Sequence, residues 1–187
     1  MNSNLQIISG KFRGRKLALP KDARPTQNRA RIALFNMLDD LRLSPTTVWD
    51  AFAGSGAFGI EFLSRGAARH VIFTDKDADS IKTINKNLAG FDKDSFTIKQ
   101  ADAIAAAAEL AARADLVFVD PPYAEPSLGE KLVAALRPGT IVVWEMEGIG
   151  HKAYGIDGFE ILKHKKYGRA EFIIMRKNNS TIHTDNG

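Results

Sequence analysis

The stretch Asp50-Ala-Phe-Ala-Gly-Ser-Gly-Ala-Phe-Gly59 decides the fold class of this 187-residue chain. Residues 48–52 read as a buried strand with Asp50 near its end, and residues 57–64 read as a helix. The glycines between them have the spacing G-x-G-x-x-G. A glycine-rich turn that leads from a strand into a helix is typical of nucleotide-binding α/β proteins.

Strand-like and helix-like segments alternate on the C-terminal side of this stretch. We expect further strands at 70–74, 96–100, 116–119 and 140–144, with helices at 78–88, 104–112 and 127–136. Alternation of this kind predicts a doubly wound, mostly parallel α/β sheet of Rossmann-like type. Two more strand-like runs, 159–164 and 170–176, flank Lys166-Tyr-Gly-Arg169 and predict an antiparallel C-terminal hairpin at the sheet edge, for seven strands in all.

The N-terminal side has a different pattern. Short apolar runs at 5–9 and 16–19 are joined by Gly10-Lys-Phe-Arg-Gly14 and predict a small β-hairpin. A linker at 20–25 precedes a helix that Thr26 can cap and that continues to about residue 41. We therefore expect a basic hairpin arm at 1–25, a catalytic α/β domain with its leading helix at 26–177, and a frayed polar tail at 178–187.

Composition narrows the class of protein. Hydrophobic residues make up 44% and charged residues 26% of the chain, as in ordinary globular proteins. The N-terminus is polar and no apolar run approaches the ~20 residues that span a membrane, so we expect no signal peptide and no membrane contact. The absence of cysteine excludes disulfides and fits a reducing cytoplasm. We expect a cytoplasmic monomer.

Positive charge is concentrated in the arm. Residues 1–31 contain eight Lys/Arg and one acid, a balance of +7, whereas the remainder has a balance of −3. A localised basic segment is the usual electrostatic footprint of a polyanion partner, although a solvated basic face or an acidic protein partner would give the same pattern. The candidate nucleic-acid contacts are Lys11, Arg13, Arg15, Lys16, Arg24, Arg29 and Arg31.

The acids around the glycine loop distinguish between possible cofactors. Asp75 lies about 20 residues beyond the loop, where a carboxylate can accept hydrogen bonds from ribose hydroxyls. Asp50 would oppose the pyrophosphate of a nicotinamide cofactor, but it suits the ammonium and sulfonium groups of S-adenosylmethionine. Asp102 could accept from the adenine amino group. The predicted cofactor site comprises Asp50, Ala51, Gly54, Ser55, Gly56, Asp75, Lys76, Asp102 and Ala103.

The segment Asp120-Pro-Pro-Tyr123 follows the expected strand at 116–119, at the sheet edge where doubly wound proteins bind ligands. Two prolines remove two backbone donors, so the loop presents acceptors only. Asp120 and the carbonyl of Pro121 could hold the hydrogens of an exocyclic amine, while Tyr123 stacks on the base. We therefore predict an S-adenosylmethionine-dependent amino-methyltransferase with its catalytic centre at Asp120, Pro121, Pro122 and Tyr123. The four histidines have no metal-ligand spacing, so no metal is expected.

Taken together, these motifs resemble the RsmD family of bacterial 16S rRNA guanine-N2 methyltransferases, which have the class I methyltransferase fold. The resemblance covers residues 5–176 and rests on Ile7-Ile-Ser-Gly-Lys-Phe-Arg-Gly-Arg-Lys-Leu17, Arg24-Pro-Thr26, Arg29, Arg31, Leu34-Phe-Asn36, Tyr167-Gly168 and the two motifs above. It implies methylation of a flipped-out guanine in 16S rRNA or the small ribosomal subunit, with the arm gripping rRNA. The chain departs from the family pattern at Gln6, Asn28 and Ile32. These departures leave the expected chemistry unchanged and affect the details of RNA docking.

Three alternatives remain open. Related Asp/Asn-Pro-Pro-Tyr loops serve N6-adenine and glutamine-amide methyltransferases, although the DNA enzymes usually carry a recognition domain for which this chain has little room. A non-catalytic RNA-binding module would be expected to show an eroded glycine loop or Asp-Pro-Pro-Tyr segment, and both are intact. A nicotinamide oxidoreductase is disfavoured by Asp50.

Overall fold

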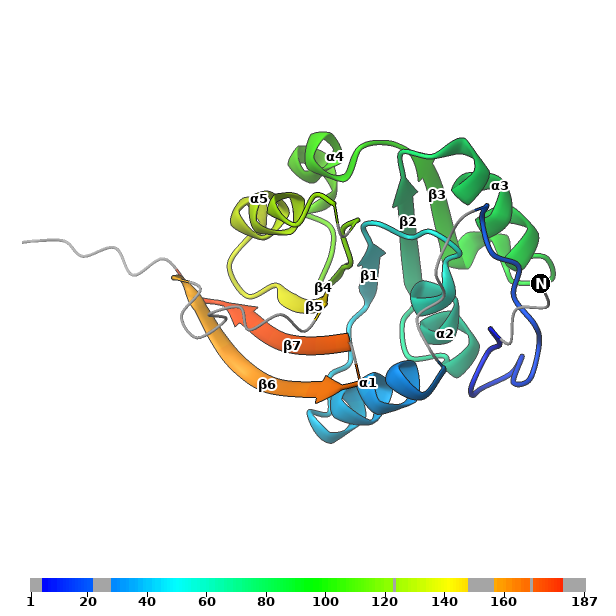
Figure 1. Cartoon of the computed structure of the whole chain (residues 1–187), viewed down its shortest axis with the longest axis horizontal. Helices are drawn as coiled ribbons and strands as arrows, with labels where there is room; N and C mark the ends of the chain where they lie inside the picture. The colour runs from blue at the N-terminus through cyan, green and yellow to red at the C-terminus, as the bar shows by residue number, and fades with distance from the viewer. Residues whose placement is uncertain (1–4, 22–27, 123, 148–156, 169, 180–187) are drawn as a thin grey trace, which may run out of the picture.

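A computed structural model gives the fold at residues 5–21, 28–122, 124–147, 157–168 and 170–179 (Figure 1). Seven strands form one sheet in the order β3-β2-β1-β4-β5-β7-β6. Neighbours among the first five strands are parallel, and β7 pairs antiparallel with both β5 and β6. The predicted doubly wound sheet is confirmed, with strands β1 (Thr47–Asp50), β2 (His70–Asp75), β3 (Phe96–Gln100), β4 (Leu116–Val119), β5 (Ile141–Glu147), β6 (Phe159–Tyr167) and β7 (Ala170–Lys177).

Helices cover both faces of this sheet. Buried side chains of the first three α-helices belong to one core cluster, and those of the last two belong to a second cluster on the opposite face. No helix in the described ranges is both long and apolar enough to cross a membrane. The helices are α1 (Asn28–Asp40), α2 (Ala57–Arg65), α3 (Ala78–Asn87), the 3-10 turn η1 (Lys93–Ser95), α4 (Ala103–Leu110) and α5 (Ser127–Ala135).

The C-terminal hairpin is longer than expected. The first strand was expected to end at His164, but β6 continues to Tyr167, which pairs directly with Ala170. Only residues 168–169 remain as the connection, and Gly168 has the positive φ of 60° that such a tight turn needs. Paired backbone therefore extends through a charged stretch that sequence pattern alone assigns to a loop.

The glycine loop connects β1 to α2, and its glycines serve two purposes. Gly54 and Gly56 have positive φ values of 53° and 76°, which side chains rarely adopt. Gly59 has no such angle, but a Cβ atom there would lie 2.4 Å from the ring of Phe73. The first two glycines therefore shape the turn, and the third lets α2 pack closely on β2.

The N-terminal arm folds back on itself, although it does not form the two regular strands that were expected. One antiparallel bridge joins Gln6 to Lys16, and the Leu17 amide donates to the Leu5 carbonyl at 2.9 Å. Leu5, Ile7 and Leu17 are buried in the same core cluster as α1, α2 and α3. In the described part of the arm, regular strand pairing is limited to the short stretch around this bridge. The apolar side chains of the arm pack on the helices, so they do not build a free-standing hairpin.

The arm lies beside α2 and α3 (Figure 1), and polar side chains of these helices fix it there. The buried Glu61 accepts the amides of Ile8 and Ser9 at 2.8 and 2.9 Å. Asn87 of α3 pairs twice with the backbone of Ala18, accepting its amide at 2.8 Å and donating to its carbonyl at 3.0 Å. The arm is therefore held along its length by side chains from two helices.

Gly10 provides a test of this docking. Gly10 and Gly14 have nearly equal positive φ values of 81° and 83°, so alanine at either position meets similar backbone strain. A Cβ atom at Gly10 would lie 1.8 Å from the Ser64 carbonyl oxygen, whereas nothing lies within 4 Å at Gly14. We expect Gly10→Ala to reduce the free energy of unfolding in urea by at least about 1 kcal/mol more than Gly14→Ala. Equal losses would mean that the arm does not dock on the end of α2.

Candidate active site

Three acids gather at the carboxyl edge of the sheet. Asp50 ends β1, and Asp120 directly follows β4. Strands β4 and β5 are paired in parallel up to Val119 and Trp144, so the next residues, Asp120 and Glu145, come side by side. Because alternate residues of a strand face the same side, all three carboxylates project toward the face covered by α1 and α2.

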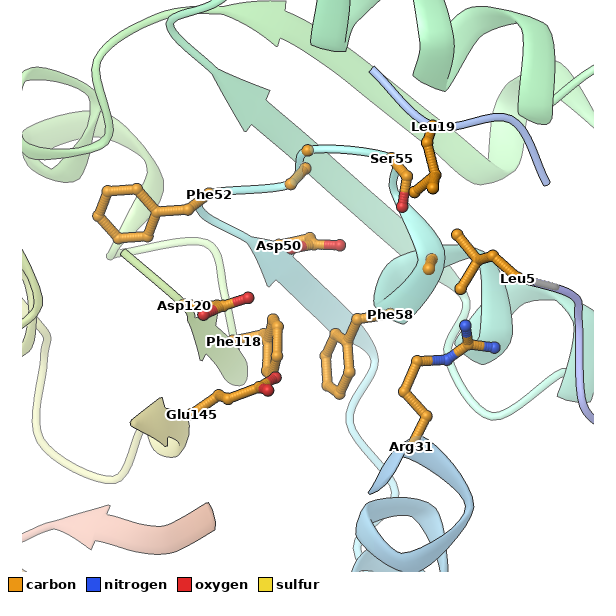
Figure 2. A pocket seen from close by; sticks show the side chains of 13 residues that line it. Leu5, Leu19, Arg31, Asp50, Phe52, Ser55, Phe58, Phe118, Asp120 and Glu145 are labelled. Atoms are coloured by element: carbon orange, nitrogen blue, oxygen red, sulfur yellow. The ribbon is translucent and has the colours of Figure 1, made fainter. Parts of the chain in front are cut away.

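These carboxylates line one pocket (Figure 2). The glycine loop borders it at 53–55, the stacked rings of Phe58 and Phe118 form a wall, and Leu5 and Leu19 of the arm reach its rim. Arg31 of α1 contributes the guanidinium. Within the described part of the chain, no three His, Asp or Glu side chains come together in a way that could hold a metal ion.

Burial raises the pKa values of two carboxyl groups in this pocket, those of Asp50 and Asp120. Asp50 is 1% exposed, and burial raises its pKa to about 7, although the bond from the Gly59 amide at 3.0 Å lowers it. Burial, and then the charge of Glu145, raise the pKa of Asp120 well above its usual range. Carboxylates in such a site are stabilised by cations and N–H donors. The pocket is therefore suited to a ligand that carries positive charge and amine hydrogens.

The expected ribose-binding residue, Asp75, stands beside the glycine loop. Its Oδ2 accepts the Gly54 amide at 2.8 Å and its Oδ1 accepts the Asp77 amide at 2.9 Å. These bonds fix the carboxylate at the edge of the loop, and each oxygen keeps lone-pair capacity for a hydroxyl. Lys76 next to it extends to Glu125, with 3.3 Å between Nζ and Oε1.

Asp102 and Ala103 follow β3 at the same sheet edge. The Ala101 amide donates to the Asp75 carbonyl at 3.0 Å, which ties this segment to the end of β2. Asp102 caps α4, since its Oδ1 accepts the amides of the second and third residues after it. Capping was not expected of Asp102. The roles of Asp75 toward ribose and of Asp102 toward adenine stay predictions.

The predicted RNA contacts differ in how far they are exposed to solvent. Lys11, Arg13, Lys16 and Arg29 are exposed. Arg15 is half-buried, with its guanidinium carbon 5.6 and 5.7 Å from the ring centres of two phenylalanines, at 12 and 91. Two further expected site residues, Arg24 and the stacking residue Tyr123, lie outside the described residues.

Arg31 does not fit the expectation of a phosphate contact at the surface. Its side chain is 3% exposed, Nη2 donates to the Gln6 carbonyl at 2.7 Å, and Nη2 lies 3.5 Å from Oε2 of Glu61. Burial lowers its pKa, and Glu61 partly offsets this effect. We therefore assign Arg31 to the pocket and remove it from the set of RNA contacts.

Glu145 is the functional candidate that sequence reasoning missed. The signal was present, because an acid after an apolar run at the end of a strand is the pattern that marked Asp50 and Asp120. Leu5 and Leu19 had no such signal: they belong to the arm, and only tertiary packing brings them to the pocket.

The raised pKa of Asp50 gives a stability prediction. Its folded-state pKa of about 7 exceeds the value near 4 in an unfolded chain, so the protein loses stability as pH rises from about 4 to about 7. Asp50→Asn removes this titration. The free energy of unfolding of the variant, relative to that of wild type, should increase by on the order of 2 kcal/mol between about pH 5 and about pH 8, which means that the variant becomes relatively more stable. The exposed Asp94→Asn serves as the control, and a flat difference for both variants would contradict the shift.

Comparison with known proteins supplies the family. The family model described as conserved hypothetical protein 95 matches residues 5–176. The Escherichia coli (strain K12) protein named ribosomal RNA small subunit methyltransferase D is 37% identical over 133 residues, which are 70% of this chain. The match spans 66% of that relative's own length, just under two thirds.

Solved structures share the fold. The structure of yhhF from Escherichia coli superimposes with a TM-score of 0.77 at 28% identity, and covers 92% of this chain and 97% of that one. Trm1 from Pyrococcus horikoshii, solved in complex with S-adenosyl-L-methionine, shares the fold at a TM-score of 0.69 and 15% identity, over 87% of this chain and 59% of that one. Membership of this methyltransferase family identifies S-adenosylmethionine as the cofactor, and the acids around the glycine loop fit its charges. The chain belongs to the conserved hypothetical protein 95 family, the RsmD family of class I methyltransferases.

Proposed function

We propose that this protein transfers a methyl group from S-adenosylmethionine to the exocyclic N2 amine of a guanine in the 16S rRNA of the small ribosomal subunit. The name of the Escherichia coli relative supports the rRNA substrate. The placement of Asp120 beside Glu145 in one buried pocket is the observation that supports guanine.

Two neighbouring carboxylates match the edge of guanine. Guanine offers two neighbouring donors, N1–H and the N2 amine, with the O6 acceptor on the far side of N1. Asp120 can accept from the amine, and Glu145, one strand over, can accept from N1–H (Figure 2). Adenine presents its amine beside an unprotonated N1, which would face the Glu145 carboxylate lone pair to lone pair. This contrast favours guanine over an adenine target.

The amine can be oriented by the chain's own groups. Bound S-adenosylmethionine supplies a methyl group on a positively charged sulfur, which is already a reactive donor. Acceptors at Asp120 and the Pro121 carbonyl hold the N2 hydrogens and so direct the nitrogen lone pair out of conjugation. Once the nitrogen has gained the methyl group it must lose a proton. Burial and the charge of Glu145, which raise the pKa of Asp120, make its carboxylate a better proton acceptor.

Access to this pocket requires that the target base leave its stack. The acids lie below the rim formed by the glycine loop and the arm, so a paired base in a helix cannot reach them. The exposed Lys11, Arg13 and Lys16 lie in the part of the arm that docks near the C-terminal end of α2, and they can neutralise backbone phosphates without reading bases. We therefore assign affinity for RNA to the arm and choice of base to the pocket.

The function can be tested directly. Purified protein and radiolabelled S-adenosylmethionine are incubated with small ribosomal subunits and with naked 16S rRNA from a strain that lacks the gene, and the methylated nucleotide is mapped and analysed. We expect N2-methylguanine at one position, and no product with Asp120→Ala, which should still bind the cofactor. A methylated adenine, a methylated protein glutamine or an active Asp120→Ala would overturn the proposal.

Glu145 should control the choice of base. 2-Aminopurine keeps the target amine but has no N1–H, so wild type should react with it much more slowly than with guanine at the mapped position. Glu145→Gln can donate to an unprotonated N1, and we expect it to reduce the guanine preference in single-turnover rates by about tenfold or more. The exposed Glu160→Gln is the control. An unchanged preference in Glu145→Gln would show that another group reads N1.

The arm should determine the salt dependence of RNA binding. Each phosphate contact adds about 0.7–0.9 to the log–log slope of affinity against salt. Lys11→Ala with Arg13→Ala should weaken RNA binding and flatten this slope by about 1–2, without changing the methylated position. Arg113→Ala with Arg137→Ala removes equal charge beside α4 and α5, on the other face of the sheet, and should leave the slope unchanged. Equal slopes for all three proteins would exclude the arm as an RNA contact.

A further inference from the structure

Arg31 is buried with part of its guanidinium unused. Nη2 is engaged by the Gln6 carbonyl and by Glu61, but Nε and Nη1 have no hydrogen-bond partner among the described residues. These two nitrogens carry three N–H groups. Buried donors to which nothing is bound are costly, and a charged group more so, because neither water nor protein compensates for them. This pattern points to an acceptor that comes from outside the chain.

The charges around Arg31 also call for an anion. Glu61 is fully buried and carries one negative charge, yet it serves two guanidiniums: Arg65 at 2.8 Å and Arg31 at 3.5 Å. Its oxygens accept two backbone amides of the arm as well. The shorter contact belongs to Arg65, which also lies 3.5 Å from the carboxylate of Asp39. Arg31 has the longer contact to the shared Glu61 and a smaller effect from the charge of Glu145, so its charge is partly neutralised. An anionic group beside Arg31 would balance the cluster.

The position of Arg31 in the pocket indicates which charges a ligand must carry. It lines the same pocket as Asp50, Gly54 and Ser55. In Figure 2 its side chain rises from α1 on the far side of Phe58 from Asp120 and Glu145. The pocket therefore has acids toward β4 and β5 and a cation toward the arm. A ligand that fills it needs a positive centre near the acids and a negative group near Arg31.

We propose that Arg31 binds the carboxylate of the amino-acid end of S-adenosylmethionine, and that the arm holds Arg31 in place for this contact. The proposal rests on the assigned cofactor and adds the residue that reads its carboxylate. S-adenosylmethionine has the required distribution of charge, since its sulfonium and ammonium lie close to a terminal carboxylate. An RNA phosphate is the weaker candidate, because a guanidinium that is 3% exposed is out of reach of a hydrated backbone.

Two pairs of ligands test this contact in titration calorimetry, the first by removing the carboxylate alone and the second by removing the whole amino-acid end. S-adenosylmethionine is compared with its decarboxylated form, and S-adenosylhomocysteine with 5′-methylthioadenosine, which lacks the amino acid. Wild type should bind the carboxylate-bearing member of each pair about tenfold or more tightly. Wild-type protein that binds both members of the first pair equally would overturn the role of Arg31 without requiring any variant. Wild type that binds no member of either pair would overturn the cofactor assignment as well.

Variants then assign the effect to Arg31. Arg31→Gln should reduce affinity for S-adenosylhomocysteine about tenfold or more and change affinity for 5′-methylthioadenosine by less than about twofold. Arg31→Lys should lie between wild type and Arg31→Gln, because a lysine keeps the charge but not the planar set of donors. Arg29→Gln, an exposed position on the same helix, is the matched control for S-adenosylhomocysteine binding. Equal losses for both ligands would mean that Arg31 only shapes the pocket, and a loss in RNA affinity alone would mean that it binds phosphate.

Discussion

The fully buried carboxylate of Glu61 holds together the parts of the structure on which the site depends. It lies on α2 and binds two amides of the arm, the guanidinium of Arg65 and that of Arg31 on α1. A buried charge is tolerated only when it is paired and hydrogen-bonded, so these partners must assemble together. Without Glu61, Arg31 would lose its ion-pair partner and the arm would lose the anchor of its two amides. Arg65 would keep its contact of 3.5 Å to Asp39. The arm is thus a structural part of the pocket as well as a basic surface.

The opposite end of the pocket depends on strand register. Parallel pairing of β1, β4 and β5 brings the carboxyl ends of three strands to one edge, and each strand delivers an acid there. Asp50 and Glu145 are buried, and Asp120 between them is half-buried. Burial raises the pKa of Asp50 to about 7, and burial together with the charge of Glu145 raises that of Asp120 well above its usual range. The stability lost by burying them is offset when a ligand brings N–H groups and positive charge. The same burial that raises these pKa values therefore suits the pocket to a ligand that carries positive charge and N–H groups.

The fold of the sheet does not by itself determine the substrate proposed for this protein. The doubly wound sheet is shared with proteins as distant as Trm1 at 15% identity, so it identifies a class of fold and no particular substrate. The proposed preference for guanine depends instead on one side chain, Glu145, next to Asp120. The proposed RNA affinity of the basic arm is independent of sequence, and the stacked rings of Phe58 and Phe118 line the pocket between the acids and Arg31. Substitutions at Glu145 or in the basic arm would change these properties without altering the strand order of the sheet.

The order of strands and helices, the glycine turn and the acids at Asp50 and Asp120 can all be predicted from the sequence. These features are local: alternation of buried residues, positive φ at Gly54 and Gly56, and an acid directly after an apolar run depend on neighbouring residues. The burial of Arg31, the position of Glu145 beside Asp120 and the contact of the arm with the pocket follow from tertiary packing alone. Those outcomes depend on contacts such as that between Ile8 and Glu61, 53 residues apart, which no local pattern encodes. A basic residue in a basic segment therefore looked like a surface contact until its buried partner was known.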